Sequence, residues 1–373
     1  MRILEIDTHD RRQVEAFLDL PFRLYRDVPQ WVPPLRHEAR LMLNRKRHPF
    51  FRHSHAAFLL AEERPGQAIG RLAILDNRNY NEFNKERMAF FFLFECEENY
   101  DAARALFEAG FAWARERGLN KMHGPKGMTP FDGLGMLARG FEHRPAFGIP
   151  YNLPYYPALV EAMGFHPGGE IVSGYLGGSY QLPDRVHQVA RAVQQRRGLR
   201  VVRYRSRRDL RALVPQLQQL YNDALKGTPG GVPLNDEEVG ALAEQLLWFA
   251  DPRLIKIVMK DDQPVGFLFA YPDVSAAVQR THGRLWPLGW LDLLLELRRT
   301  KWVNINGAGI IEKYRGLGGT ALLFSELEKS VHEGGFAHAD LVQVGVENDK
   351  MQRELAELGI DFYKMHRMYE REI

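Results

Sequence analysis

The chain has 373 residues, of which 45% are hydrophobic and 26% are charged, and its net charge is +3. This balance excludes a disordered or fibrous protein, and the length exceeds what one hydrophobic core usually covers, so two domains or a large insertion are expected. The only cysteine, Cys96, excludes an internal disulfide and a cysteine-based zinc site, and the small net charge gives no argument for nucleic acid.

Strands and helices alternate along the first half of the chain. Helical segments carry apolar residues three and four positions apart, and strand segments are rich in β-branched and aromatic residues. The Pro65-Gly66 pair between two strands predicts a hairpin. In order, the prediction is strand 2–6, a helix, strands 56–62 and 68–75, strand 89–95, helix 101–118, strand 121–124, a helix ending at Gly164 and a last strand.

The second half predicts the same order of elements. A helix over 183–197, stopped by Gly198, connects the halves. It is followed by strand 199–204, a helix, strands 255–260 and 265–271, strand 302–310, helix 319–334, strand 339–346, a helix ending at Gly359 and a last strand. Each half is therefore expected to form a mixed α/β sheet flanked by helices.

Matched residues recur at one long period along the chain. Ile69-Gly70 returns 196 positions later as Val265-Gly266, and Asn152 returns as Asn348. A collinear series of such matches indicates a tandem duplication whose halves meet near 180–198. The expected domains are residues 1–182, a connecting helix at 183–198, and residues 199–373.

The most informative stretch is a glycine-rich turn between a strand and a helix. The strand ending at Ile310 and Ile311 runs into Arg315-Gly316-Leu317-Gly318-Gly319-Thr320, where the next helix begins. Glycines let the backbone approach a ligand closely, and the free N–H groups at a helix start attract phosphate. The spacing matches neither a Walker loop nor the dinucleotide Gly-x-Gly-x-x-Gly pattern. A glycine turn without a ligand explains the same residues.

In this setting the turn resembles that of the GNAT acyltransferase superfamily. In that family the turn, written Gln/Arg-x-x-Gly-x-Gly/Ala, holds the pyrophosphate of acyl-coenzyme A, and the preceding strand pairs with pantetheine. Arg315 and Gly318 match, Thr320 stands where Gly or Ala is usual, and Gly319 is an alternative last glycine of the motif. Asn348 matches the asparagine that opens the last helix. The resemblance implies coenzyme contacts by Ile310, Ile311, Arg315, Gly316, Leu317, Gly318, Gly319, Thr320 and Asn348.

The whole chain also resembles one tandem group, the bacterial ceramide synthase-like proteins. The matching stretches are 21–35, 48–51, 70–71, 124–125, 151–156, 347–348 and 364–370, whereas the usual Lys-Asp after Gly-Phe is missing at 166–170. The resemblance implies an N-acyltransferase that moves an acyl group, acetyl or longer, from coenzyme A to a small-molecule or lipid-like amine. The alternative is a sensor that binds acyl-coenzyme A without catalysis, because Thr320 departs from the motif and Leu355 replaces the family's tyrosine.

The first half lacks the glycine turn. Its corresponding segment, 96–101, has no glycine and carries Glu97, Glu98 and Asp101, which would repel a pyrophosphate. One coenzyme per chain is therefore expected, with the first half acting as a scaffold or as the acceptor side. The aromatic cluster at 151–156 would suit a cleft wall, or equally a packed core.

Two residues are candidates for proton transfer in the implied reaction. Glu347, at a strand end beside Asn348, is the candidate base, and Tyr363, just after the last helix, is the candidate acid for the leaving thiolate. A helix-capping acid and a packed aromatic explain the same two residues. Cys96 lies in the half without the turn, so a covalent cysteine intermediate is not expected.

Other segments received simpler interpretations. No acidic or cysteine partner is expected near His48, His53 and His55, so a surface loop is expected there and no metal site. Nine arginines between 191 and 211 are expected to form a solvated face, and no nucleic-acid partner is expected. Contact with nucleic acid or an anionic membrane is the minor alternative. The apolar 285–299 segment predicts a helix between the halves, or one that lines an acyl groove or contacts a membrane peripherally.

No signal peptide or membrane-spanning segment is evident in the sequence, so a cytoplasmic location is expected. The oligomeric state is not predicted.

Overall fold

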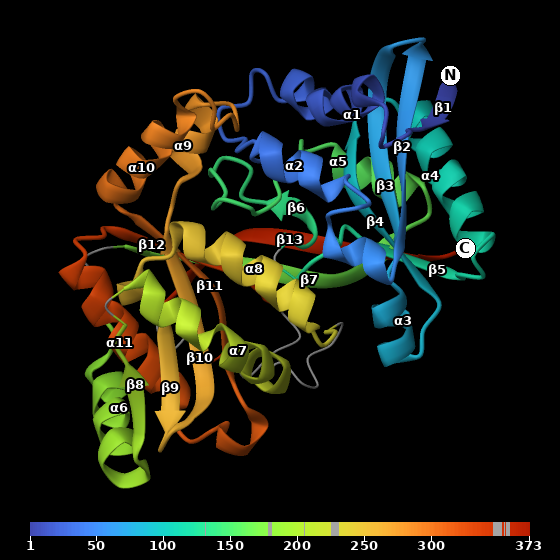
Figure 1. Ribbon diagram of the computed structural model, residues 1–373. Helices are drawn as coiled ribbons and strands as arrows, with labels where there is room; N and C mark the ends of the chain where they lie inside the picture. Colours follow the sequence, from blue (N-terminus) through green and yellow to red (C-terminus); the bar gives the residue numbers. More distant parts are fainter. Residues whose placement is uncertain are drawn as a thin grey trace.

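The computed structural model describes residues 1–130, 132–177, 181–204, 206–224, 231–345, 353, 355 and 359–373. Within this part of the chain the strands form one continuous sheet with helices on both faces (Figure 1). The mixed α/β class predicted from the sequence is confirmed, and the strands are mostly antiparallel. Only β4–β5 and β11–β12 run parallel among the described strand pairs.

The first half follows the predicted order. Its strands are β1 (Arg2–Glu5), β2 (His55–Arg64), β3 (Gln67–Asp76), β4 (Met88–Cys96), β5 (Lys121–Gly124), β6 (Met136–Arg139) and β7 (His166–Gly177). Its helices are α1 (Arg11–Leu24), α2 (Arg36–Met42), η1 (Pro49–Arg52), α3 (Arg78–Asn84), α4 (Tyr100–Arg115) and α5 (Tyr156–Ala162). The short elements α2, α3 and β6 were not predicted, because segments of four to seven residues give little periodic signal.

The second half repeats this order with added helices. Its strands are β8 (Leu199–Val202), β9 (Lys256–Lys260), β10 (Gln263–Pro272), β11 (Trp302–Ile310), β12 (His338–Gly345) and β13 (Asp361–Glu372). Its helices are α6 (Asp184–Arg197), α7 (Arg207–Ala224), α8 (Asp236–Phe249), η2 (Pro252–Leu254), α9 (Ser275–Arg280), α10 (Gly289–Arg299), η3 (Glu312–Tyr314) and α11 (Gly319–Glu333). The predicted helix ending at Gly359 falls largely outside the described residues.

The two halves repeat each other in backbone detail. The N–H of Glu97 donates to the carbonyl of Ile69 at 2.9 Å, and the N–H of Ile311 donates to the carbonyl of Val265 at 3.0 Å. Ile69 and Val265 are the pair matched in the sequence. Four residues before each donor the strand bulges with a positive φ, +51° at Leu93 and +98° at Gly307. These matched irregularities confirm the tandem arrangement.

The last strand of each half lies in the sheet of the other half. β13, at the C-terminus, runs between β5 and β7, and β7 runs between β13 and β12. The register pairs Tyr369 with Gly124 on one side, and Gly177 with His338 on the other. Figure 1 shows the C-terminus beside β5, far along the sheet from α11. This exchange makes one sheet of two repeated units.

Two polar contacts tie distant segments of the chain together, and the second of them joins the two halves. Lys364 of β13 and Asp340 of β12 form an ion pair at 2.9 Å with both side chains almost fully buried. His53 of the first half lies 3.1 Å from Glu238 of α8, so the expectation that no acid lies near the three histidines was wrong. The reason is tertiary, because α8 brings Glu238 next to the first half from a distant part of the sequence.

The apolar 285–299 segment forms α10 and the turn before it. Its inner face packs with α9 against Leu35 and Phe147 of the first half, as the interpretation of a helix between the halves requires. The N–H of Arg36 donates to the carbonyl of Gly283 at 2.9 Å, which fixes this contact. The outer face of α10 is exposed. Among the described residues, no helix is both long and apolar enough to cross a membrane.

Acid is expected to destabilise this fold through buried neutral histidines. Burial lowers the pKa of His366 to about 4, and its Nε2 lies 3.0 Å from the carbonyl of Pro150. The unfolded chain takes up a proton near the ordinary pKa of 6.5 and the folded chain does not, so stability falls as pH falls from 6.5 to 4. His366→Asn should remove up to about 3 kcal/mol of this loss, measured by urea unfolding at pH 7 and pH 4. The exposed control His37→Asn should keep the full loss; equal curves for the two variants would contradict the assignment.

Candidate active site

The parallel strands β11 and β12 separate partway along their length. They pair only from Trp302 to Ile305 on β11 and from His338 to Leu341 on β12. Beyond this point β12 stays paired with β7, and β11 stays paired with β10 as far as Ile310. Among the described residues, the edge of β11 that faces β12 is thus left without a strand partner from 306 to 310. A Cβ built on Gly307 would meet no described atom within 4 Å.

The unpaired end of β11 leads into the glycine turn. Gly316 and Gly318 have φ values of +72° and +87°, which only glycine adopts without strain. Helix α11 begins at Gly319 with no side-chain cap. After Arg315, the next described N–H with a backbone acceptor is that of Leu322, which donates to the carbonyl of Gly318. Within the described chain, the N–H groups from 316 to 321 are therefore available to an anion.

Arg315 holds the turn against neighbouring elements. Its guanidinium donates to the carbonyl of Ile310 at 3.1 Å and to the carbonyl of Ala224, at the end of α7, at 2.9 Å. In this structure the guanidinium of Arg315 therefore shapes the turn.

The matching region of the first half is filled by the protein itself. The Tyr155 hydroxyl donates to the carbonyl of Cys96 at 2.7 Å, and the N–H of Cys96 donates to the Tyr156 hydroxyl at 3.0 Å. Leu93 stands at the bulge where β11 has Gly307. Asn99 caps α4 by accepting a hydrogen bond from the N–H of Ala102 at 3.0 Å. The backbone groups that β11 and α11 leave free are thus occupied in the first half.

A buried carboxylate anchors these tyrosines. Glu95 accepts hydrogen bonds from the hydroxyls of Tyr25 at 2.6 Å and Tyr156 at 2.8 Å, with Arg71 at 3.8 Å. Burial raises the pKa of Glu95, and Arg71 and the two hydroxyls oppose that rise. Of the aromatic residues predicted either to line a cleft or to fill a core, Tyr156 is a fully buried core residue, Tyr155 packs against that core and Tyr151 is partly buried. Burial also raises the pKa of Cys96 to about 12, so its thiol is a poor nucleophile.

A polar cluster lies where β11 and β12 part. Asp340 pairs in register with Asn304, and its Oδ2 accepts from Lys364. Among described residues its Oδ1 has no hydrogen-bond partner, although it is buried. Burial raises the pKa of Asp340, and Lys364 opposes that rise. A buried acceptor with an unused lone pair at the start of the strand separation is suited to take a proton or a polar substrate group.

Tyr363 joins this cluster from the exchanged strand. It sits at an irregularity of β13, between Phe362 and Lys364, where the pairing with β7 shifts. Burial raises the pKa of Tyr363, and the nearby Asp340 raises it further, so the phenol stays protonated. Its ring packs against His143 at 4.8 Å between centroids. The candidate acid thus lies beside Asp340, on the strand that the first half shares.

Comparisons with known proteins give the same architecture. The chain aligns over its full length with a tandem GNAT protein from the clavulanic acid biosynthesis pathway, covering 98% of that chain, with a TM-score of 0.58 and 13% identity. A GCN5-related N-acetyltransferase from Sphaerobacter thermophilus gives a TM-score of 0.53 with 13% identity, over 100% of this chain and 95% of that one. The chain has the tandem GNAT fold. No family model matches the sequence.

Two curated relatives align with nearly the whole of this chain. Protein YghO of Escherichia coli is 26% identical over 98% of this chain and 94% of its own length. The bacterial ceramide synthase of Caulobacter vibrioides is 26% identical over 96% of this chain and 94% of its own length. The resemblance to the bacterial ceramide synthase-like group, predicted from the sequence, is confirmed.

Some of the predicted site residues lie in described elements of the fold, and others lie outside the described residues. Ile310 and Ile311 lie at the end of β11, and the turn 315–320 follows, while Tyr363 comes from the other half's sheet. Glu347 and Asn348 lie outside the described residues. Sequence reasoning missed Asn304, Asp340 and Lys364. Asn304 and Asp340 stand out as polar residues inside mostly apolar strands, whereas Lys364 lies in a strand of many charged residues and gives no such signal.

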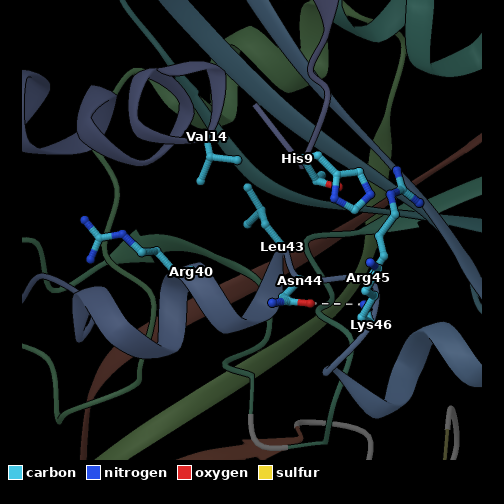
Figure 2. A pocket seen from close by; sticks show the side chains of 8 residues that line it. His9, Val14, Arg40, Leu43, Asn44, Arg45 and Lys46 are labelled. Atoms are coloured by element: carbon cyan, nitrogen blue, oxygen red, sulfur yellow. Dashed lines mark hydrogen bonds between the residues drawn. The ribbon is translucent and has the colours of Figure 1, made fainter. Parts of the chain in front are cut away.

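A separate cavity of about 150 Å³ lies in the first half between α1 and α2 (Figure 2). It is lined by Thr8, His9, Val14, Arg40, Leu43, Asn44, Arg45 and Lys46. The Arg40 guanidinium is engaged by Glu15 at 2.9 Å, and Arg45 donates to the carbonyl of Ala56 at 2.8 Å. None of the predicted site residues borders this cavity.

In the described ranges, no group of three or more His, Cys, Asp or Glu side chains is placed to hold a metal ion.

The glycine turn tolerates no side chain at Gly318. A Cβ there would lie 2.6 Å from Cγ2 of Val193 and 3.0 Å from Cγ1 of Val189, both on α6, and φ is +87°. Gly318→Ala should therefore lower the free energy of unfolding by about 2–4 kcal/mol, combining backbone strain with overpacking. A Gly318→Glu variant, the obvious charge probe of this turn, would disturb the fold for the same reason.

The matched control is Gly240 of α8, where a Cβ would meet nothing within 4 Å. Gly240→Ala should stabilise the protein by up to about 1 kcal/mol, because alanine favours the helix. Chemical denaturation of both variants measures the two effects. A Gly318→Ala protein as stable as the parent would show that the turn and α6 do not pack as described.

Proposed function

We propose that the chain is an N-acyltransferase that uses acyl-coenzyme A, bound by the second half. The observation that carries the proposal is the contrast between the halves. In the second half, the described residues 306–321 keep N–H groups without an acceptor and a strand edge without a partner. In the first half, at 93–102, the helix is capped and tyrosines bond to the strand edge. The N-acetyltransferase named among the structural neighbours and the ceramide synthase named among the relatives support the reaction class.

The residues of the second half fit the coenzyme by chemistry. The uncapped start of α11 offers N–H groups and the positive end of a helix dipole to a pyrophosphate. The unpaired edge of β11 offers backbone groups to the pantetheine amides. Asn348 is proposed to contact the coenzyme, as the resemblance to the GNAT superfamily implies. On this proposal, residues 199–373 form the coenzyme domain, 183–198 connect, and residues 1–182 form the acceptor side or a scaffold.

The reaction joins an amine nitrogen to the thioester carbonyl and breaks the C–S bond, giving an amide and free coenzyme A. When bound, the coenzyme supplies the activated acyl group. The amine must lose a proton, and the leaving thiolate must gain one. Glu347 stays the proposed base, and Asp340 is a second acceptor because its Oδ1 is unpartnered among described residues. Tyr363, protonated and adjacent to Asp340, is the proposed donor to the thiolate.

Thr320→Glu tests the coenzyme site without disturbing the turn. Thr320 lies in the first turn of α11, where an added carboxylate favours the helix but repels a pyrophosphate. Calorimetry should give about one acyl-coenzyme A per chain for the parent, and affinity at least about tenfold weaker for the variant, roughly 1.4 kcal/mol. Thr320→Gln, of the same size without charge, should keep binding. Two sites per chain, or equal affinity in both variants, would contradict the proposed site.

Tyr363→Phe tests the proposed acid. Release of free thiol from acyl-coenzyme A in the presence of amines should slow by roughly 10²- to 10⁴-fold, with KM for the coenzyme little changed. Tyr175→Phe is the matched control, because Tyr175 is a neighbouring tyrosine, 6.0 Å between ring centroids, whose hydroxyl instead meets His338. Full activity in Tyr363→Phe would remove this residue from the mechanism. Coenzyme binding without thiol release by the parent would favour the sensor.

We propose that the donor carries an acyl chain longer than acetyl, and the order of elements along β11 supports this proposal. The glycine turn lies at the end of this strand, the separation from β12 in its middle, and α10 just before its start. A chain that continues from the thioester away from the turn therefore runs toward the apolar α9–α10 region (Figure 1). Each buried CH₂ contributes about 0.8 kcal/mol, so affinity should rise from acetyl- through octanoyl- to palmitoyl-coenzyme A. A flat series, or one that favours acetyl, would contradict a long-chain donor.

A further inference from the structure

An exposed apolar patch covers the outer side of α10 and the turn before it. Trp286 is 82% exposed and Leu288 is 67% exposed, and the other members are 40–43% exposed. The patch consists of Trp286, Leu288, Trp290, Leu291, Leu294 and Leu295. Six large apolar side chains on one short segment are unusual for a free protein surface and indicate something that covers them.

The exposed charged residues that flank the patch in the sequence are all positive. Arg284 precedes it, and Arg298 and Arg299 follow Leu294 and Leu295 by three to five positions, so they extend the same helix face. All three arginines are exposed. The patch therefore has a cationic rim at both ends.

The acids of α10 are turned away from this rim and neutralised. Asp292 accepts from Arg280 of α9 at 2.8 and 3.0 Å, and Glu296 accepts from the same guanidinium at 2.6 Å. Arg280 lowers the pKa of Asp292, so the pair remains ionised at neutral pH. The ion pair binds α9 to α10 and removes negative charge that would oppose an anionic partner.

The inner face of α10 is already used. Leu293 is fully buried, and it packs with Val278 and with Leu35 of the first half. The helix is therefore held rigidly on the protein, and its outer stripe cannot fold inward to hide itself. Within the described residues no other segment covers the outer stripe, so we look for an occupant outside them.

We propose that this patch docks the protein on an anionic lipid bilayer. Tryptophans with leucines on one face and arginines at the ends are the composition of helices that lie in a membrane interface, where arginines reach the headgroup phosphates. A second copy of the chain fits less well. A two-fold contact would bring the arginine rims of the two copies together, and the patch residues include no exposed acid that could pair with these arginines. The patch needs no coenzyme, so the inference stands independently of the proposed reaction.

Vesicle co-sedimentation of the full chain tests this docking. The protein should sediment with phosphatidylcholine vesicles that contain phosphatidylglycerol, and at least about tenfold less with phosphatidylcholine alone. Leu294→Gln/Leu295→Gln should weaken sedimentation by at least about tenfold, because it removes apolar surface while keeping helix-forming residues. Phe83→Gln, at an exposed apolar residue of α3 (56% exposed), is the matched control and should sediment like the parent.

Charge reversal separates docking from general attraction. Arg298→Glu/Arg299→Glu should reduce sedimentation with anionic vesicles, whereas Arg196→Glu/Arg197→Glu, the same pair at the end of α6, should not. Equal losses from both pairs, or no sedimentation by the parent, would overturn the proposal. So would a dimer in light scattering that Leu294→Gln/Leu295→Gln dissociates, because the occupant would then be a second copy. Unchanged circular dichroism and melting of each variant confirm that it is folded.

Discussion

The exchange of the last strands between the two halves is the constraint on which the rest of the structure depends. With β13 between β5 and β7, neither half can complete its sheet without the other. The buried Lys364–Asp340 pair lies at this junction, and breaking such a pair costs several kcal/mol because an uncompensated charge stays buried. The same exchange puts Tyr363 beside Asp340, so the candidate chemistry depends on how the halves interlock.

Duplication followed by divergence explains why two similar folds carry different sites. Both halves keep the bulge in the fourth strand of the repeat and the hydrogen bond that follows it. In the first half, Leu93, Tyr155 and Tyr156 satisfy the strand edge, and Asn99 caps the helix. In the second half, glycines leave the equivalent groups free. The first repeat thereby satisfies these backbone groups, whereas among the described residues the second repeat leaves them open to a ligand.

The α9–α10 insertion links this site to the surface. It begins right after β10, and Asp273 at that point accepts hydrogen bonds from Asn304 of β11 at 2.9 Å and from the backbone N–H of Phe147 at 3.3 Å. The insertion is thus tied to both halves close to the separation of β11 from β12. On the proposals above, α10 faces lipid at one end of the strand and the turn holds a phosphate at the other, an order that suits a long acyl chain between them.

The sequence by itself determined the repeat, the order of the long elements and the glycine turn, because these depend on local periodicity and on residues that only a turn of this kind requires. Strands 121–124 and 302–310 were predicted with the bounds they have. The strand exchange, the Glu238 partner of His53 and the cluster around Asp340 were decided only by tertiary structure. Each joins residues from distant parts of the chain, and a buried charge within an apolar strand does not reveal its partner until the sheet order is known.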